Sequence, residues 1–204
     1  LTFWRERLAD PPPPLDLPLD RARGAVQSFR GASRSRPLPV GTGNQLARFA
    51  EREGATLFQA ALGALFAALA RITGRDDLVV GTPAAARPTP ELEKLIGFFV
   101  DTMVVRQELD SAATFRSLVA AARQGMLEAL EHRAVPFERL VEEIAPGRNM
   151  NRTPIFQAMF VIERQEEPRI ALGSSGVSLV RRRIETGTSK FDLSLGIAVL
   201  PSGD

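Results

Sequence analysis

The sequence predicts an α/β fold in which a mixed β-sheet is flanked by helices. Segments with the apolar spacing of helices alternate along the chain with short β-branched runs. Paired helices and strands follow one another in mixed runs, an order that favours a layered α/β unit. The composition of the 204 residues, 44% hydrophobic and 25% charged, is typical of a globular chain with one sizeable core.

The N-terminal part is predicted to be a helix end followed by a connector. Residues Leu1–Leu8 favour a helix, and Pro11–Pro14 end it because proline favours extended backbone and lacks an N–H. We expect residues 9–25 to be an extended, Pro-rich connector within one domain. Residues 26–37 predict a strand with Phe29 as its large anchor, and a short helix is expected over 44–53.

The next segment predicts a buried helix and a buried strand. Thr56 is a good N-cap, and residues 57–72 are apolar on nearly all sides, which is typical of a helix between a sheet and other helices. Gly74 fits the end of this helix. The run 76–83 predicts a short strand stopped by Gly81 and Pro83. Gly81-Thr82 could offer backbone groups to a phosphate, but no glycine-rich phosphate motif follows, which favours a plain turn.

The longest strand-like run is Ile96–Arg106, and it contains an acid. Side chains alternate along a strand, so Asp101 shares a face with Phe99, Met103 and Val105, away from Arg106. Burial of a carboxylate is costly unless it is hydrogen-bonded, so we expect Asp101 to have a partner. An Asp101 that reaches water at a bulge or strand end is the open alternative.

The C-terminal part predicts two helices and several strands. Thr114 caps an amphipathic helix to Glu131, and Pro136 is at the favoured first position of a second helix that Pro146-Gly147 ends. Short β-branched or aromatic runs predict the remaining strands, over 157–163, 170–172, 177–183 and 191–200.

Composition excludes several classes of site. The chain has no Cys and one His, His132, so disulfides, thiolate chemistry and the usual zinc sites are excluded. We favour a structural role for His132 over a general-base role. The net charge is only +2, and the pI of 9.9 is high because few groups titrate between about pH 7 and 10, so nucleic-acid binding is not indicated. Arg181–Arg183 is interpreted as a solvated strand end, with a carrier or nucleotide contact as the alternative.

Three motifs, in order and with similar sequence between them, resemble those of the condensation domains of nonribosomal peptide synthetases. Residues 96–106 resemble the family's Ile-Gly-x-Phe-Val-Asn-Thr…Arg motif, and 132–138 resemble His-Gln-Asp-x-Pro-Phe-Glu. Residues 148–156 resemble Arg-Asp-x-Ser-Arg-Asn/Thr-Pro-Leu-Phe. Asp101 stands where the family usually has Asn, and Arg133 and Ala134 stand where it has Gln and Asp, which leaves the substrate subtype open.

The resemblance implies a chloramphenicol acetyltransferase-like half-domain, one of two α/β halves that meet at a tunnel. Residues 1–204 are expected to be its C-terminal subdomain, incomplete at both ends. The implied reaction joins two carrier-bound thioester substrates through an amide bond. The family's His-His-x-x-x-Asp-Gly motif has no match here, so we expect no catalytic residue in this chain and no condensation by the isolated fragment.

The resemblance also implies a set of motif or tunnel-wall residues, and no metal ligand. Ser189 could line the tunnel, but we favour a hydrogen bond at the entry to a strand as its role. The residues are Gly97, Phe99, Val100, Asp101, Thr102, Arg106, Pro136, Phe137, Glu138, Arg152, Pro154 and Ser189.

The implied partners are the N-terminal half of the same domain, peptidyl or aminoacyl carrier proteins and an adjacent adenylation domain. No cofactor is expected to bind directly; the carriers would deliver phosphopantetheine arms. No nucleic acid or membrane partner is expected, because no run reaches the roughly 18 apolar residues of a membrane span, and a cytoplasmic location is expected. The alternatives are a non-catalytic platform of the same fold that recruits a partner protein, and a coenzyme A-dependent acyltransferase.

Overall fold

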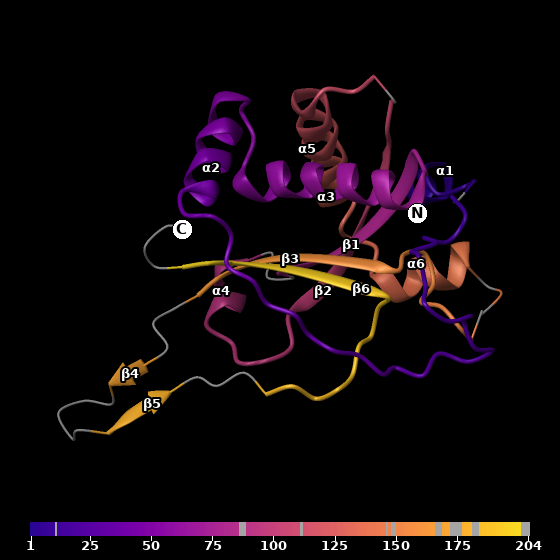
Figure 1. Cartoon of the computed structure of the whole chain (residues 1–204). Coiled ribbons are helices and arrows are strands. Elements are labelled where there is room, and N and C mark those ends of the chain that lie inside the picture. Colours follow the sequence, from indigo (N-terminus) through magenta and orange to yellow (C-terminus); the bar gives the residue numbers. More distant parts are fainter. Residues whose placement is uncertain are drawn as a thin grey trace.

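The helices and strands follow the expected α/β order in the computed structural model (Figure 1). The structure describes residues 1–10, 12–85, 89–110, 112–145, 147, 150–165, 169–171, 177–180 and 184–200. The helices are α1 (Thr2–Arg7), α2 (Thr42–Arg52), α3 (Leu57–Thr73), α4 (Pro90–Glu93), α5 (Phe115–Glu131) and α6 (Phe137–Ile144). The strands are β1 (Asp77–Ala85), β2 (Val100–Glu108), β3 (Ala158–Arg164), β4 (Arg169–Ala171), β5 (Ser178–Val180) and β6 (Leu193–Val199).

The main sheet is mixed, as predicted. Its strand order is β2-β1-β3-β6. β1 and β2 are antiparallel, whereas β3 is parallel to both β1 and β6. β4 and β5 form a separate antiparallel pair that projects from the body of the molecule (Figure 1).

The helices α3 and α5 cover one side of this sheet (Figure 1). α3 begins with the capping box expected from Thr56: the Gln59 backbone N–H donates to Thr56 Oγ1, and the Thr56 N–H donates to Gln59 Oε1. Gly63 lets α3 approach α5 closely, because a Cβ there would lie 3.3 Å from the Val119 Cα. Buried side chains of α3, β1, β2 and β3 form the core, including Leu62, Phe66, Val80, Val104 and Phe160.

The connector over 9–25 contains no helix or strand in its described part, and it runs along the other side of the sheet (Figure 1). It is nevertheless anchored. The buried Leu15 donates its N–H to Gln157 Oε1 at 2.6 Å. The Arg23 guanidinium forms a two-point pair with Asp192, at 3.0 and 2.6 Å.

Several sequence expectations were wrong in detail. The strand over 26–37 is reduced to one bridge, Arg30–Thr188, because Phe29 has a φ of 55° and is exposed. The strand expected from residue 96 begins at Val100, where Ala85, the last residue of β1, still supplies a partner. β1 does not stop at Gly81-Thr82 but continues through Pro83. Pro136 is the N-cap of α6 rather than its first residue, and α4 was not expected.

Within the described part of the chain, no single helix is long and apolar enough to span a membrane. Taken together, α2 and α3 would pass such a test, but they meet at a bend of 103°.

Candidate functional site

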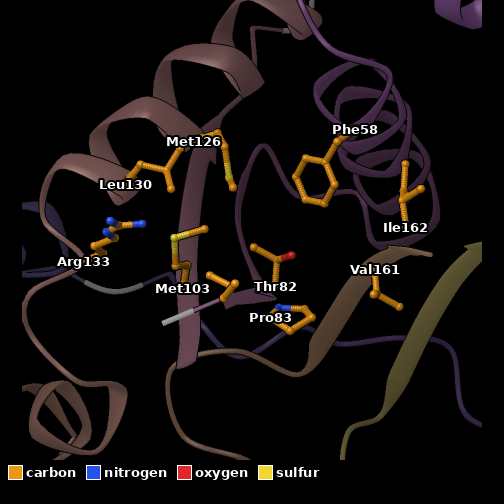
Figure 2. Close-up of a pocket in the computed structure, with 11 residues that line it drawn as sticks. Phe58, Thr82, Pro83, Met103, Met126, Leu130, Arg133, Val161 and Ile162 are labelled. Carbon is orange, nitrogen blue, oxygen red and sulfur yellow. The ribbon is translucent and has the colours of Figure 1, made fainter. Parts of the chain in front are cut away.

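A pocket opens where the main sheet splits. β1 pairs with β3 only at Val80–Ala158 and Gly81–Met159, although β1 continues beside β2 as far as Ala85. Pro83 has no N–H to offer a neighbouring strand, which suits the free side of β1 in this region. The gap holds a cavity of about 360 Å³, which we call the split pocket. It is lined by Phe58, Thr82, Pro83, Ala84, Ala85, Met103, Met126, Leu130, Arg133, Val161 and Ile162 (Figure 2).

Four elements place the walls of the split pocket. Met103 on β2 is the register partner of Thr82 on β1, so their side chains lie side by side on the helical face of the sheet. Phe58 comes from the first turn of α3, which the Thr56 cap fixes. Met126 and Leu130 lie one turn apart on α5 and face the same space (Figure 2).

The polar groups of the split pocket are Thr82 and Arg133. Thr82 is only 1% exposed, and its Oγ1 has no hydrogen-bond partner among the described residues. A buried hydroxyl without a partner destabilises a fold by about 1–3 kcal/mol, so the wall of the pocket contains one destabilising polar group. Arg133 is exposed at the edge of the pocket and forms no ion pair with any described residue. A wall without carboxylate, imidazole or amine fits binding rather than acid–base catalysis.

The opening motif, residues 96–106, borders the split pocket. Val100, Asp101 and Thr102 are register partners of the lining residues Ala85, Ala84 and Pro83. Asp101 is half-buried, and its Oδ1 accepts the Thr102 N–H at 2.7 Å, which confirms the expected hydrogen bond. Asp101 also lies at the start of the strand, as the open alternative had it. The Phe99 ring folds over Gly97, where a Cβ would lie 2.8 Å from Phe99 Cε2.

Arg106 ties strands and a helix together rather than serving the pocket. Its Nε and Nη2 donate to the two carboxylate oxygens of Asp77 at 2.9 and 2.6 Å, and Nη1 donates to the Arg7 carbonyl at 2.8 Å. The hydrogen bond with Asp77 raises the pKa of Arg106 above its usual value, while partial burial opposes the rise. Arg106 and Asp101 lie on opposite faces of β2, as expected, and are not paired.

The other two motifs build the packing on the opposite face of the sheet. Phe156 covers Gly81 so closely that a Cβ there would overlap its ring. Phe137 and Phe191 both pack against Phe156, with ring centroids 5.4 and 5.3 Å from its own. Arg152 lies 3.6 Å from Asp16 of the connector.

Pro136, Glu138 and Pro154 are exposed. Arg148 and Asn149 lie outside the described residues, as do Arg181–Arg183.

His132 and Ser189 have local structural partners. The His132 ring stacks on Phe3 at 3.7 Å, its Nδ1 lies 2.9 Å from the Glu128 carbonyl, and its own carbonyl accepts the Trp4 indole N–H. These contacts agree with the favoured structural role. Ser189 Oγ donates to the Phe191 carbonyl at 2.6 Å just before β6, which agrees with a hydrogen bond at strand entry.

Sequence reasoning missed the pocket residues. Gly81-Thr82 was predicted to be a plain turn, and the helix that ends at Glu131 was predicted only to be amphipathic. The signal that could have found them is local: a polar Thr inside a buried apolar strand, before a proline. Within the described residues no group of His, Cys, Asp or Glu could hold a metal ion.

Comparison with known proteins gives one family. A family model described as "Condensation domain" matches residues 1–203. The chain is 38% identical over 201 residues to malpinin synthetase of Mortierella alpina, covering 98% of this chain and 3% of that protein. It is 40% identical over 198 residues to phosphinothricin tripeptide synthetase PhsC of Streptomyces viridochromogenes, covering 96% of this chain and 18% of that protein.

Solved structures agree with this result. The X-domain from teicoplanin biosynthesis superposes with a TM-score of 0.86 at 31% identity, over 100% of this chain and 46% of that chain. The same kind of domain in a complex with OxyB gives a TM-score of 0.85 at 30% identity, over 100% and 44%. The chain therefore spans less than half of these neighbours and a small fraction of the curated relatives.

Proposed function

Because the chain belongs to the condensation-domain family of nonribosomal peptide synthetases, with the chloramphenicol acetyltransferase-like fold of that family, we propose that it is part of a domain that joins two carrier-bound thioester substrates through an amide bond. The downstream amine attacks the upstream thioester carbonyl, and the carrier thiol leaves. The phosphopantetheine arms come from the carrier proteins, and an adenylation domain loads the acceptor. We place this reaction in the cytoplasm.

The observation that carries the proposal is the uncovered apolar surface at the opening motif. Ile96 is fully exposed, Phe98 is 90% exposed and Val100 is 49% exposed. Apolar side chains that gather on a surface mark an interaction site. We infer that the N-terminal half of the same domain covers these residues and forms the tunnel with them.

The residues present support a division of the chemistry between two halves of the domain. The described part of this chain brings together no acid–base pair or oxyanion donor set at the split pocket. The proton transfer and the stabilisation of the tetrahedral oxyanion fall to the His-His-x-x-x-Asp-Gly motif of the other half. This half supplies a tunnel wall and a binding pocket beside the opening motif.

A second candidate is a platform that binds a partner protein without condensing substrates. The similarity to the X-domain solved in a complex with OxyB favours it. The two candidates differ in product: an amide in one case, a protein complex without an amide in the other.

The test uses the intact condensation domain that contains this chain, with two carriers loaded with aminoacyl groups. Mass spectrometry of the carrier-bound products should show the amide. The variant Phe98→Glu should abolish the product because it places a charge in the covered surface, whereas Ile72→Glu, on an exposed position of α3, should leave it unchanged. Absence of product from the wild-type domain with every aminoacyl pair, together with tight binding of a partner protein, would replace the enzyme by the platform.

A further inference from the structure

We propose that the split pocket binds an extended chain of secondary amides, which lies as an additional strand between β1 and β3. Two parts of the proposed substrates have this chemistry: the phosphopantetheine arm of a carrier and the backbone of a peptidyl group. The inference rests on the proposed function and deepens it, because it names what the pocket holds. It is carried by free backbone groups on two strands that face each other across the pocket.

The main sheet has a gap where the split pocket opens. β1 and β3 pair only at Val80–Ala158 and Gly81–Met159. β1 then continues for four more residues beside β2, and β3 continues for five more residues beside β6. At about 3.3 Å per residue, four residues give about 13 Å of strand edge on each side of the gap. No strand of the described part of the chain lies between these two edges.

On β1, the backbone groups of Pro83 and Ala85 face this gap. The Leu109 N–H donates to the Asp76 carbonyl at 2.7 Å, next to the first pair of β1 and β2. Asp76 therefore faces β2, and so does every second residue after it, because successive residues of a strand direct their peptide groups to opposite sides. Pro83 and Ala85 are at the alternate positions and face the space on the side of β3.

On β3, the backbone of Ile162 faces the same gap. The Gln157 carbonyl accepts the Leu193 N–H at 3.2 Å, so Gln157 and every second residue after it face β6. Ile162 is at an alternate position and faces the side of β1. Figure 2 shows Ile162 and Pro83 on different sides of the pocket that both of them line.

These backbone groups specify a ligand that both donates and accepts. Pro83 has no N–H and offers only its carbonyl, so the group opposite it must donate. Ala85 and Ile162 each offer an N–H and a carbonyl. Pro83 and Ala85 are exposed and Ile162 is half-buried, so a ligand can reach all three. Within the described residues, no hydrogen bond occupies these groups on the side of the gap.

A chain of secondary amides meets this requirement. Each amide carries one donor and one acceptor, whereas a hydrocarbon chain has neither and an ester has no donor. Addition of an extended chain to an open strand edge is a recurring mode of recognition in which main-chain hydrogen bonds provide the affinity. The pocket volume of about 360 Å³ and the apolar side chains of Phe58, Met103 and Met126 suit the methylene and methyl groups between the amides.

The direct test measures binding to the intact condensation domain that contains this chain, by ligand-observed NMR. S-methylpantetheine represents the carrier arm, and N-acetyl-alanyl-alanine methylamide represents a peptidyl backbone. Each is compared with an analogue in which esters replace the amides. In at least one of the two pairs we expect the amide compound to bind about fivefold more tightly, because an ester leaves the strand carbonyls without a donor. The pair that shows the preference identifies the source of the chain.

Variants and hydrogen exchange place the ligand in the gap. Ala85→Pro removes an N–H that faces the gap and should weaken binding of the amide compound. Met126→Trp should fill the pocket and abolish binding of every compound. Leu127→Trp, its neighbour on α5 and 40% exposed, is the matched control and should bind as the wild type does. Thermal midpoints show whether each variant is folded. In the wild type, bound ligand should slow amide hydrogen exchange at Ala85 and Ile162, which needs no variant.

The outcomes separate the pocket from the reaction. Equal binding of amides and esters by the wild type, no binding of any compound, or slowed exchange only at residues other than Ala85 and Ile162 would overturn the assignment of the pocket. Failure of the wild type to join the groups on two loaded carriers would instead overturn the proposed function, and the binding titration would still decide the pocket. A domain that condenses but binds neither amide compound would keep the proposed function and lose the pocket.

Discussion

At the residue scale, Thr82 and Asp101 lie close together on paired strands but differ in how their polar atoms are satisfied. Asp101 has a partner in the next residue's N–H, so the acid within an apolar strand is tolerated. Thr82 has none among the described residues, although it is the more deeply buried.

Replacing Thr82 should therefore stabilise the fold. Thr82→Val keeps the shape and removes the unpaired hydroxyl, so the free energy of unfolding should rise by about 1 kcal/mol. Chemical denaturation of the intact domain without substrate measures it. Thr73→Val is the control: the Thr73 hydroxyl donates to the Leu69 carbonyl at 2.7 Å, and its loss should not stabilise. A fall in stability for Thr82→Val would show that its hydroxyl is already satisfied.

A second residue-scale prediction concerns Glu143, which links α6 to α1. The hydrogen bond from Arg5, at 2.8 Å, lowers the pKa of Glu143 below its usual value, with further help from the charges of Arg5 and Arg139. A lowered pKa means that the ion pair stabilises the fold above the ordinary carboxyl pKa and that this contribution is lost as the pH falls through the lowered value.

The thermal midpoints of the wild type and Glu143→Gln, measured from neutral to acidic pH, check this. The wild type should be the more stable at pH 7. The difference should begin to shrink as the pH falls below the ordinary carboxyl pKa of about 4.3 and should vanish below the lowered pKa of Glu143. A difference that stays constant with pH would contradict the assigned pair. Glu142→Gln, whose side chain is 64% exposed, serves as the control.

At the element scale, β1 contributes neighbouring residues to the two opposite faces of the sheet. One face offers Thr82 to the split pocket, and the other offers the bare backbone of Gly81 to the Phe156 ring. The absence of a side chain at Gly81 thus lets the second and third motifs pack on the sheet, while the neighbouring residue serves the pocket.

A methyl group at Gly81 should be severely destabilising. Gly81→Ala places a Cβ into the Phe156 ring and should cost about 3 kcal/mol or more, as overpacking of a rigid core does. Gly196→Ala on β6 is the matched control, because its Cβ would make an ordinary contact 3.6 Å from Val161 Cγ1. The denaturant midpoints of both variants measure the two losses of stability. A double variant with Phe156→Leu should recover part of the loss, and no recovery would place the strain elsewhere.

At the scale of the whole molecule, local signals predicted well and long-range pairing did not. The helices α3 and α5 could be predicted because the apolar period and the Thr caps agree within each segment. The start of β2 was wrong because it depends on where β1 ends, and the split pocket depends on where β1 and β3 part, near Gly81 and Met159. Those pairings join residues far apart in sequence, so local sequence patterns cannot predict them.

The exposed surface at Ile96 and Phe98 leads to a prediction for the 204-residue chain alone. We expect it to associate at micromolar concentrations and to form no amide with two loaded carriers, because its apolar surface is uncovered and the histidine motif is absent. Ile96→Glu with Phe98→Glu should reduce association, which size-exclusion chromatography with light scattering would detect. Amide formation by the isolated chain would contradict the division of the site between two halves.

The pair between Arg23 and Asp192 has a consequence for synthesis on the ribosome. The two residues are separated by 169 positions, and at about 5–20 residues per second the second emerges many seconds after the first. The α3–β1–β2–α5 segment makes mostly contacts within its own sequence and is complete long before then. Arg23 therefore has no partner while these elements assemble, and the connector reaches its final position only after Asp192 has been synthesised.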